Sequence, residues 1–404
     1  MRSTLEKIRL TRKPSQAATV KKVSLAERFT QVRRYTEFIC EPLATEDYVV
    51  QPVEFVSPPK WHLAHTTWFF EEFILVPHYR NYKRFHPQYS FLFNSYYESM
   101  GNRVLRPDRG NMSRPSVEEI FQYRGYVDEH VLWLLNDFPE EARSILEIGL
   151  HHEQQHQELL YTDIKFILGH NPLFPHYKTD VRETPTNEYD RSFVDISEGR
   201  YSIGHKKNTF AYDNEGGAHT VILKPFSIRK SLATNHEYLQ FMQAGGYQTH
   251  DFWHSDGWAW VKENNIVAPL YWYFIEGTWY RYALSGLEKV NLEEPVTHVS
   301  FYEASAFASW LDMRLPTEFE WEAAADQFQW GLRWEHTNSA YLPYPGYTKP
   351  DGPVGEYNGK FMVNNMVLRG ASAMTPENHS RKTYRNFFYP ALRWQFNGIR
   401  LCKK

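Results

Sequence analysis

The chain has 404 residues, of which 42% are hydrophobic and 17% aromatic, and its formal net charge is -3. A chain of this length usually divides into two or more domains, because a single core stops growing near about 250–300 residues. The near-neutral charge argues against a nucleic acid as the partner. No apolar run reaches the roughly 18 residues that span a bilayer, so no membrane segment is expected.

Two features at the ends of the chain bear on its location. Residues 1–24 are basic and polar and lack the apolar stretch of a secretory signal, so we expect a mobile N-terminal arm. The two cysteines, Cys40 and Cys402, are too few for a disulfide scaffold or a cysteine-rich metal site. We therefore expect both cysteines to be reduced thiols, as in a cytoplasmic protein.

The first half of the chain has the pattern of a helical bundle. Apolar residues recur at spacings of three and four within residues 25–40, 59–75, 116–137 and 139–168. These segments predict an antiparallel four-helix bundle with long connections. The longest connection, residues 77–114, is rich in Tyr, Phe and Arg, and connections of this length are usually functional.

The second half has a different pattern. Short strand-like runs lie at residues 192–196, 200–204 and 219–228, with turns between them and helical segments at 235–245 and 300–312. The prediction is an α+β protein with a helical domain over residues 25–185. An irregular domain with many loops follows over residues 186–404.

Histidines in two predicted helices suggest a metal site. His152 and His156 are four residues apart, so both rings project from one helix face. His62 and His65 are three apart on another helix, and their spacing does not decide which of them faces that pair. Imidazole ligands suit iron, zinc, copper or nickel, so the ligand type leaves open either redox chemistry or zinc chemistry.

Several motifs resemble one enzyme family. The segments SPPKWHLAHTTWFFEEFIL and HHEQQHQELL resemble the DinB-like domain of sulfoxide synthases of ergothioneine biosynthesis, the hercynine oxygenases. The segments PVTHVSFYEASAFASWLDMRLPTEFEWEAAA, VLRGAS and NGIRLCKK resemble the formylglycine-generating-enzyme domain, a variant of the C-type lectin fold. The two blocks in this order are specific for these synthases.

The resemblance implies a reaction and a ligand set. Its metal would be Fe(II), and its substrates would be hercynine, L-cysteine and O2, with sulfur joined to the imidazole ring as a sulfoxide. The ligands implied are the second histidine of HLAH and both histidines of HEQQH, which are His65, His152 and His156. Gln155, in the same motif, would help to hold hercynine.

The long connection and the C-terminal segment supply further implied site residues. Tyr96 or Tyr97 would donate a proton beside the iron, because a phenol can give a proton without carrying charge, and of the two we favour Tyr97. Asn386 and Phe387 match positions around the betaine. The candidates for binding the cysteine carboxylate are Arg103, Arg106 and Arg109. The RPDRG motif favours Arg106 and Arg109.

One departure bears on the sulfur donor. Synthases that use γ-glutamylcysteine carry an acidic residue and an arginine where this chain has Phe388 and Leu392. The difference favours cysteine. The alternatives are a selenoneine synthase that takes a selenosugar, a metal-dependent thiol S-transferase, and a non-catalytic binding protein. The sequence does not predict the oligomeric state.

Overall fold

The computed structural model describes residues 24–184, 189–206, 209–351, 355 and 358–404. The predicted N-terminal arm lies outside these residues, except for Ser24, whose side chain caps the first helix. The N-terminal half is helical, as expected. Its helices are α1 (Leu25–Cys40), α2 (Pro59–Phe70), α3 (Val76–His78), α4 (Tyr89–Phe93), α5 (Val117–Leu134) and α6 (Arg143–Gly169).

The predicted helices and the observed ones differ mainly at their ends. Ser116 is the N-cap of α5, and its hydroxyl and the Glu119 carboxylate form a capping box. The segment predicted as one helix over 59–75 changes to a π-helical turn at Glu71–Leu75. There the buried Glu71 carboxylate accepts hydrogen bonds from the hydroxyls of Tyr123, at 2.6 Å, and Tyr82, at 2.8 Å. π-Helical turns of this kind often lie near functional sites.

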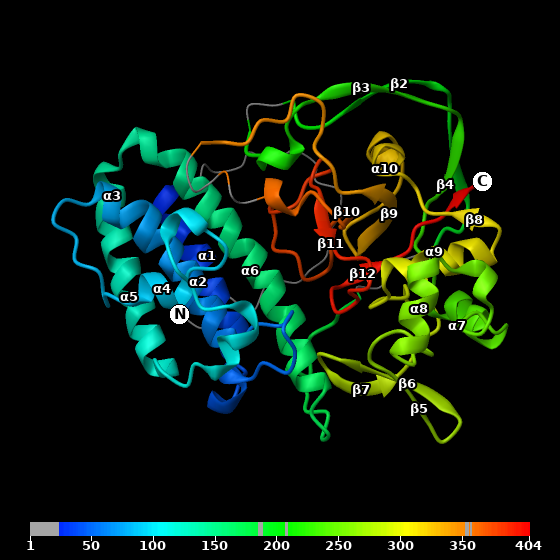
Figure 1. Cartoon of the computed structure of the whole chain (residues 1–404), viewed down its shortest axis with the longest axis horizontal. Coiled ribbons are helices and arrows are strands. Elements are labelled where there is room, and N and C mark those ends of the chain that lie inside the picture. Colours follow the sequence, from blue (N-terminus) through cyan, green and yellow to red (C-terminus); the bar gives the residue numbers. More distant parts are fainter. Residues whose placement is uncertain (1–23, 185–188, 207–208, 352–354, 356–357) are drawn as a thin grey trace.

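Helix α6 lies at the centre of the molecule. In Figure 1 it runs along the boundary between the blue and cyan helices and the orange and red segments of the C-terminal half. On one side it packs against α1 and α2, and α2 also packs against α5. Residues of α6 therefore contact both halves of the chain.

The C-terminal half combines small sheets with short helices. Its strands are β1 (Phe193–Ile196), β2 (Gly199–Ile203), β3 (His219–Leu223), β4 (Phe226–Arg229), β5 (Trp272–Ile275), β6 (Thr278–Ala283), β7 (Gly286–Lys289), β8 (Met313–Arg314), β9 (Trp334–Ala340), β10 (Met366–Gly370), β11 (Asn386–Phe388), β12 (Asn397–Gly398) and β13 (Cys402–Lys403). Its helices are α7 (Asn235–Gln243), α8 (Ser255–Glu263), α9 (Phe301–Trp310) and α10 (Glu318–Ala324). Within the described residues, the sheet orders are β1-β4-β13-β8, β11-β10-β9-β12, β2-β3 and β5-β6-β7.

The run predicted over 219–228 forms two strands rather than one. β3 ends at Leu223 and pairs with β2, whereas β4 begins at Phe226 and pairs with β1. Pro225 lies between them, and because proline lacks a backbone N–H it interrupts a strand ladder. Helices α8 and α10 and the β5-β6-β7 meander were not expected from the sequence.

The RLPTEFEWEAAA segment is held by ion pairs with its surroundings. Arg314 pairs with Glu320, at 2.7 Å, within the segment. Glu318 accepts from the buried Arg385, at 2.8 Å. Glu322 pairs with the buried Arg369 of β10. These contacts join α10 to the sheet that carries β11.

Both cysteines are free and buried, at opposite ends of the chain. Burial raises the pKa of the Cys40 thiol and of the Cys402 thiol to about 12 in each case. Both thiols are therefore protonated at neutral pH. Of the helices in the described ranges, none combines the length and apolar character needed to cross a bilayer.

Candidate metal centre

Three buried histidines from two helices meet at one point. His65 comes from α2, and His152 and His156 come from consecutive turns of α6. One ring nitrogen of each lies within 4.8 Å of the others, and Nε2 of His65 is 3.2 Å from Nε2 of His152. Two nitrogens bound to one ion at about 2.1 Å lie roughly 3 Å apart, so the spacing fits a shared metal ion.

Close packing of α2 and α6 produces this cluster. Gly149 lies one turn before His152, and a Cβ atom there would lie 2.8 Å from the Phe70 ring and 2.9 Å from the Phe69 ring. A larger residue would push the helices apart. On another side of α6, the buried Glu153 pairs with Arg33 of α1, at 2.9 Å, and Arg124 of α5, at 2.5 Å. These charges fix the rotation of α6 about its axis.

The histidine rings of the cluster are neutral. Burial lowers the pKa of His152 to about 3. Burial also lowers the pKa values of His65 and His156 well below the usual range, and neighbouring histidines lower them further. Neutral imidazoles offer lone pairs, which a metal requires.

The tautomer of His65 is fixed by its backbone partner. Its Nδ1 lies 2.6 Å from the Phe93 carbonyl oxygen. A carbonyl only accepts hydrogen bonds, so Nδ1 carries the proton and Nε2 presents a lone pair towards His152. The trio can therefore hold a metal ion through His65 Nε2.

His62, the alternative that spacing left open, is not in the trio. Its Nε2 is 2.9 Å from Asp163 Oδ2, and its Nδ1 is 2.8 Å from His156 Nδ1. Both of its ring nitrogens thus contact other side chains, so His62 lies on the far side of His156 from the point where the trio converges. The geometry favours His65, as the resemblance implied.

Arg109 is brought close to the trio by the long connection between α2 and α5. Its guanidinium lies 3.4 Å from the ring centroid of Trp61, and that ring stacks on His65. It donates to the hydroxyls of Ser57, at 2.9 Å, and Ser95, at 3.1 Å. Arg109 is 5% exposed, and within the described ranges its Nε has no hydrogen-bond partner and it makes no ion pair. Burial lowers its pKa well below the usual range, so an anionic ligand would stabilise its charge.

The other two arginines lie at the surface. Arg103 pairs with the exposed Glu98, and Arg106 is exposed and donates to the Phe55 carbonyl oxygen at 2.5 Å. Of the three arginines, Arg109 is the one placed beside the histidines.

The ring of Trp68 lies between the tyrosine pair and the trio. Tyr97 is buried against Trp68, with centroids 5.6 Å apart, and Trp68 stacks on His65. Tyr96 stacks on Tyr97 and is partly exposed. The structure thus brings the tyrosine predicted to act, Tyr97, deeper into the site than its neighbour.

The predicted betaine-binding residues lie on the C-terminal side of this aromatic group. Asn386 and Phe387 are on β11, paired with β10. The ring of Phe387 stacks on Phe361, at 5.8 Å, and Phe361 packs edge-on against Tyr96, at 5.5 Å. Gln155 donates to the Tyr384 hydroxyl at 2.6 Å, so α6 is hydrogen-bonded to the C-terminal half beside the trio.

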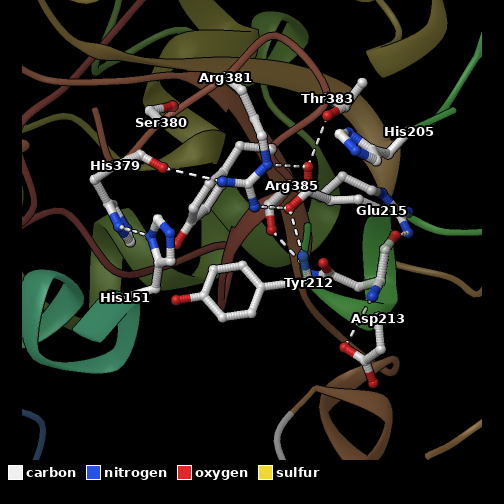
Figure 2. Close-up of polar contacts among 12 residues, drawn as sticks. His151, His205, Tyr212, Asp213, Glu215, His379, Ser380, Arg381, Thr383 and Arg385 are labelled. Atoms are coloured by element: carbon white, nitrogen blue, oxygen red, sulfur yellow. Dashed lines mark hydrogen bonds and ion pairs between the residues drawn. The ribbon is translucent and has the colours of Figure 1, made fainter. Parts of the chain in front are cut away.

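A second pair of histidines joins the halves of the chain. Figure 2 shows His151 of α6 facing His379, whose Nδ1 is 3.2 Å from that of His151. Beside this pair, Arg381 lies over the ring of Tyr212 and pairs with Glu215. Consecutive residues of a helix point about 100° apart, so His151 faces His379 rather than the trio although it neighbours His152 in sequence.

Sequence reasoning missed several residues that complete the site. Trp61, Asp163 and Trp394 lie around the histidines, but nothing in the local sequence pattern distinguishes them from ordinary core residues. Glu158, also on α6, joins the helix to the C-terminal half. Its carboxylate accepts from Trp334 Nε1 at 2.7 Å, Thr375 Oγ1 at 2.7 Å and Ser372 Oγ at 2.5 Å, and burial raises its pKa.

Comparisons with known proteins place both halves of the chain. The DinB superfamily matches residues 28–160, and the sulfatase-modifying factor enzyme 1-like domain matches residues 177–340. A formylglycine-generating enzyme of Thermomonospora curvata is 31% identical over an alignment covering 50% of this chain and 69% of that protein. The C-terminal half thus belongs to the sulfatase-modifying factor enzyme 1-like family.

Two relatives match most of the chain. A hercynine oxygenase of Mycolicibacterium thermoresistibile is 27% identical over 86% of this chain and 87% of that protein. A hercynine oxygenase of Mycolicibacterium smegmatis is 28% identical over 78% of this chain and 83% of that protein. The chain belongs to the hercynine oxygenase family. In this member of the family, the histidine trio lies in the DinB part and borders the second domain.

Proposed function

We propose that this chain is an Fe(II)- and O2-dependent oxygenase that joins the sulfur of L-cysteine to the imidazole ring of hercynine. The observation that carries the proposal is the buried, neutral trio of His65, His152 and His156. The reaction balances without an added reductant. A ring C–H and a thiol S–H are replaced by a C–S bond, one oxygen atom enters the sulfoxide and the other leaves as water.

The trio would hold the iron, and bound iron would supply the redox chemistry with dioxygen. Three protein ligands leave coordination positions for other molecules, whereas a fully protein-ligated site would not. Burial of the rings excludes water and keeps each imidazole neutral.

Arg109 would bind the carboxylate of cysteine. A buried guanidinium with no carboxylate among its described partners has a strong electrostatic reason to bind one. Its stacking on Trp61, next to His65, supports a position from which the thiol of the same small amino acid reaches the metal. Arg103 and Arg106 would then stabilise the loop through Glu98 and Phe55 rather than bind the substrate.

Hercynine would bind between α6 and the C-terminal half. Gln155 lies next to His156 and is held by Tyr384, which supports a role in orienting the substrate imidazole. A trimethylammonium group lacks N–H donors, so aromatic faces and amide oxygens suit it. Phe387 and Asn386 offer both, and the aromatic rings that link Phe387 to Tyr96 support this placement.

Tyr97 would hold or deliver a proton near the reacting atoms. It is buried one ring away from His65, whereas Tyr96 is partly exposed and its backbone oxygen accepts from Lys360. An uncharged acid inside an apolar pocket carries a smaller desolvation cost than an ionised one.

The choice of cysteine over γ-glutamylcysteine is supported by Phe388 and Leu392. Phe388 packs edge-on against Trp394, with centroids 5.3 Å apart, and Leu392 also packs against the core. A charged glutamyl arm would need polar partners at these positions, and an apolar lining does not provide them.

The proposal also includes a domain division and a location. We propose a DinB-like domain over residues 25–185 and a second domain over residues 186–404. We also propose that the enzyme is cytoplasmic. Cell fractionation of the producing organism tests the location.

The decisive experiment supplies purified chain and Fe(II) with hercynine, cysteine and O2. We expect a sulfoxide with the mass of both substrates plus one oxygen atom less two hydrogens, and one O2 consumed for each product. Parallel reactions replace cysteine with γ-glutamylcysteine or with a selenosugar. Turnover without oxygen uptake would instead support a thiol S-transferase, and preferred use of the selenosugar would support a selenoneine synthase.

A further inference from the structure

A chain of hydrogen bonds runs behind His156, away from the metal point. Nδ1 of His156 is 2.8 Å from Nδ1 of His62, and Nε2 of His62 is 2.9 Å from Oδ2 of Asp163. Asp163 also accepts from the backbone N–H of Ser57, at 2.8 Å, and from Nε1 of Trp394, at 2.9 Å. All five residues are buried or nearly so.

The direction of these hydrogen bonds follows from the groups whose protons cannot move. The backbone N–H of Ser57 and the indole N–H of Trp394 only donate, so both oxygens of Asp163 act as acceptors. His62 therefore donates from Nε2, which leaves its Nδ1 as an acceptor. His156 must then carry its proton on Nδ1, and its lone pair lies on Nε2.

We infer that Asp163 and His62 are positioning residues that hold His156 in the tautomer a metal ion requires. This inference rests on the metal site proposed above, and it adds two residues that contact neither metal nor substrate. Metal-binding histidines commonly donate their second ring N–H to an acceptor, which fixes the ring and raises its basicity. Here a second imidazole lies between that histidine and the carboxylate.

The chain of bonds also makes the second domain part of the metal site. Trp394 lies in the C-terminal half, and its ring packs on Phe55, at 5.1 Å, and on Phe388, at 5.3 Å. It supplies one of the two fixed donors that keep Asp163 an acceptor. The ligand state of His156, in the first domain, thus depends on a residue of the second domain.

Asp163→Asn tests the inference because an amide has one donor end. If its NH2 faces Trp394, the amide N–H and the indole N–H point at each other and no hydrogen bond forms. If its NH2 faces His62, it opposes the Ser57 N–H, and the tautomers of His62 and His156 are both reversed. A reversed His156 presents Nε2–H to the metal. We expect Asp163→Asn to bind Co(II), used as a spectroscopic substitute for iron, about 10- to 100-fold more weakly.

A second substitution should restore binding. In Asp163→Asn/Trp394→Phe the donor that opposes the amide NH2 is gone, so the amide oxygen can accept from both Ser57 and His62. We expect this double variant to bind Co(II) within a few-fold of Trp394→Phe alone. If Asp163 and Trp394 were only packing residues, the double variant would bind no better than Asp163→Asn, and the inference would be wrong.

The tautomer can also be measured in the metal-free wild-type chain. Nitrogen-15 spectra of histidine-labelled protein should show His156, assigned by loss of its signal in His156→Gln, protonated at Nδ1. Protonation at Nε2 would overturn the inference, even if the chain binds metal. If the wild-type chain fails to bind Co(II) or Fe(II) while the spectrum shows Nδ1–H, the proposed metal site fails and the tautomer assignment stands.

Discussion

Arg109 and His65 lie on the same indole ring. The guanidinium of Arg109 is 3.4 Å from the centroid of Trp61, and the ring of His65 stacks on Trp61 with centroids 4.5 Å apart. A cation and a proposed metal ligand thereby contact the same buried side chain. An arrangement of this kind suits a small substrate with an anionic group at one end and a metal-binding atom at the other.

Replacing Arg109 with glutamine should therefore weaken the binding of cysteine. A hydrogen bond to a charged group is worth about 1.5–3 kcal/mol, so we expect the KM for cysteine to rise roughly 10- to 100-fold with little loss of iron. Steady-state kinetics with each substrate varied in turn would show this effect. Arg103→Gln, on the exposed pair with Glu98, is the matched control and should leave KM unchanged. A larger effect on hercynine than on cysteine would contradict the assignment.

Removing the hydroxyl of Tyr97 should separate binding from product formation. Tyr97→Phe keeps the ring that packs on Trp68 and Phe73, so iron content and hercynine affinity should stay near those of the wild type. Sulfoxide formation should fall at least tenfold, since general acid catalysis typically contributes about 10²–10⁴-fold. Part of the cysteine should then leave as its sulfinic acid, which mass spectrometry would detect.

Tyr96→Phe distinguishes the two tyrosines. If Tyr97 moves the proton, the Tyr96 variant should keep most of its activity. Equal losses in both variants, or an unchanged ratio of sulfoxide to sulfinic acid in Tyr97→Phe, would show that Tyr97 does not deliver the proton.

Loss of a single histidine of the trio should abolish metal binding. His156→Ala leaves two ligands on different helices, so we expect iron, measured by elemental analysis after gel filtration, to fall to background. His65→Ala should behave in the same way. His151→Ala is the neighbouring control: it removes the contact with His379 but no member of the trio, so the metal should remain.

Glu153 should contribute stability that depends on pH. Burial alone would raise its pKa, but Arg124 and Arg33 outweigh burial and hold it at about 2, against an ordinary value of 4.5. The unfolded chain thus takes up a proton at a higher pH than the folded chain. The stabilisation is complete above about pH 4.5 and is lost as the pH falls towards 2.

Glu153→Gln isolates this contribution. Because it leaves two buried arginines without their shared partner, we expect the free energy of unfolding at pH 7 to fall by about 3–5 kcal/mol. The difference between wild type and variant should shrink as the pH is lowered from 4.5 towards 2. Urea unfolding at several pH values would measure both quantities. A difference that does not change with pH would rule out ionised Glu153 as its source.

The helical half could be predicted from sequence because its signals are local. Apolar spacing identified α5, and the HEQQH spacing identified the face of α6 that carries the trio. The exchange from α-helix to π-helix at Glu71 could not be predicted in this way. It accompanies hydrogen bonds with Tyr82 and Tyr123, which lie 11 and 52 residues further along the chain.

The site was predictable only in part, for the same reason. The histidines proposed as ligands stand in a recognisable motif, whereas Asp163 and Trp394 meet across 231 residues of sequence. Spacing could not choose between His62 and His65, since both lie on one face of α2. The choice depends on the Phe93 carbonyl, which fixes the tautomer of His65, and on Asp163, which accepts a hydrogen bond from His62.

The burial of Cys40 and Cys402 has a practical consequence for the proposed reaction, which would use a thiol and oxygen together. Mixed disulfides form through exposed thiolates, and both thiols of this chain are inaccessible and protonated at neutral pH. The protein should therefore survive high concentrations of cystine without covalent adducts. A colorimetric thiol reagent added to native enzyme during turnover would count substrate sulfur alone.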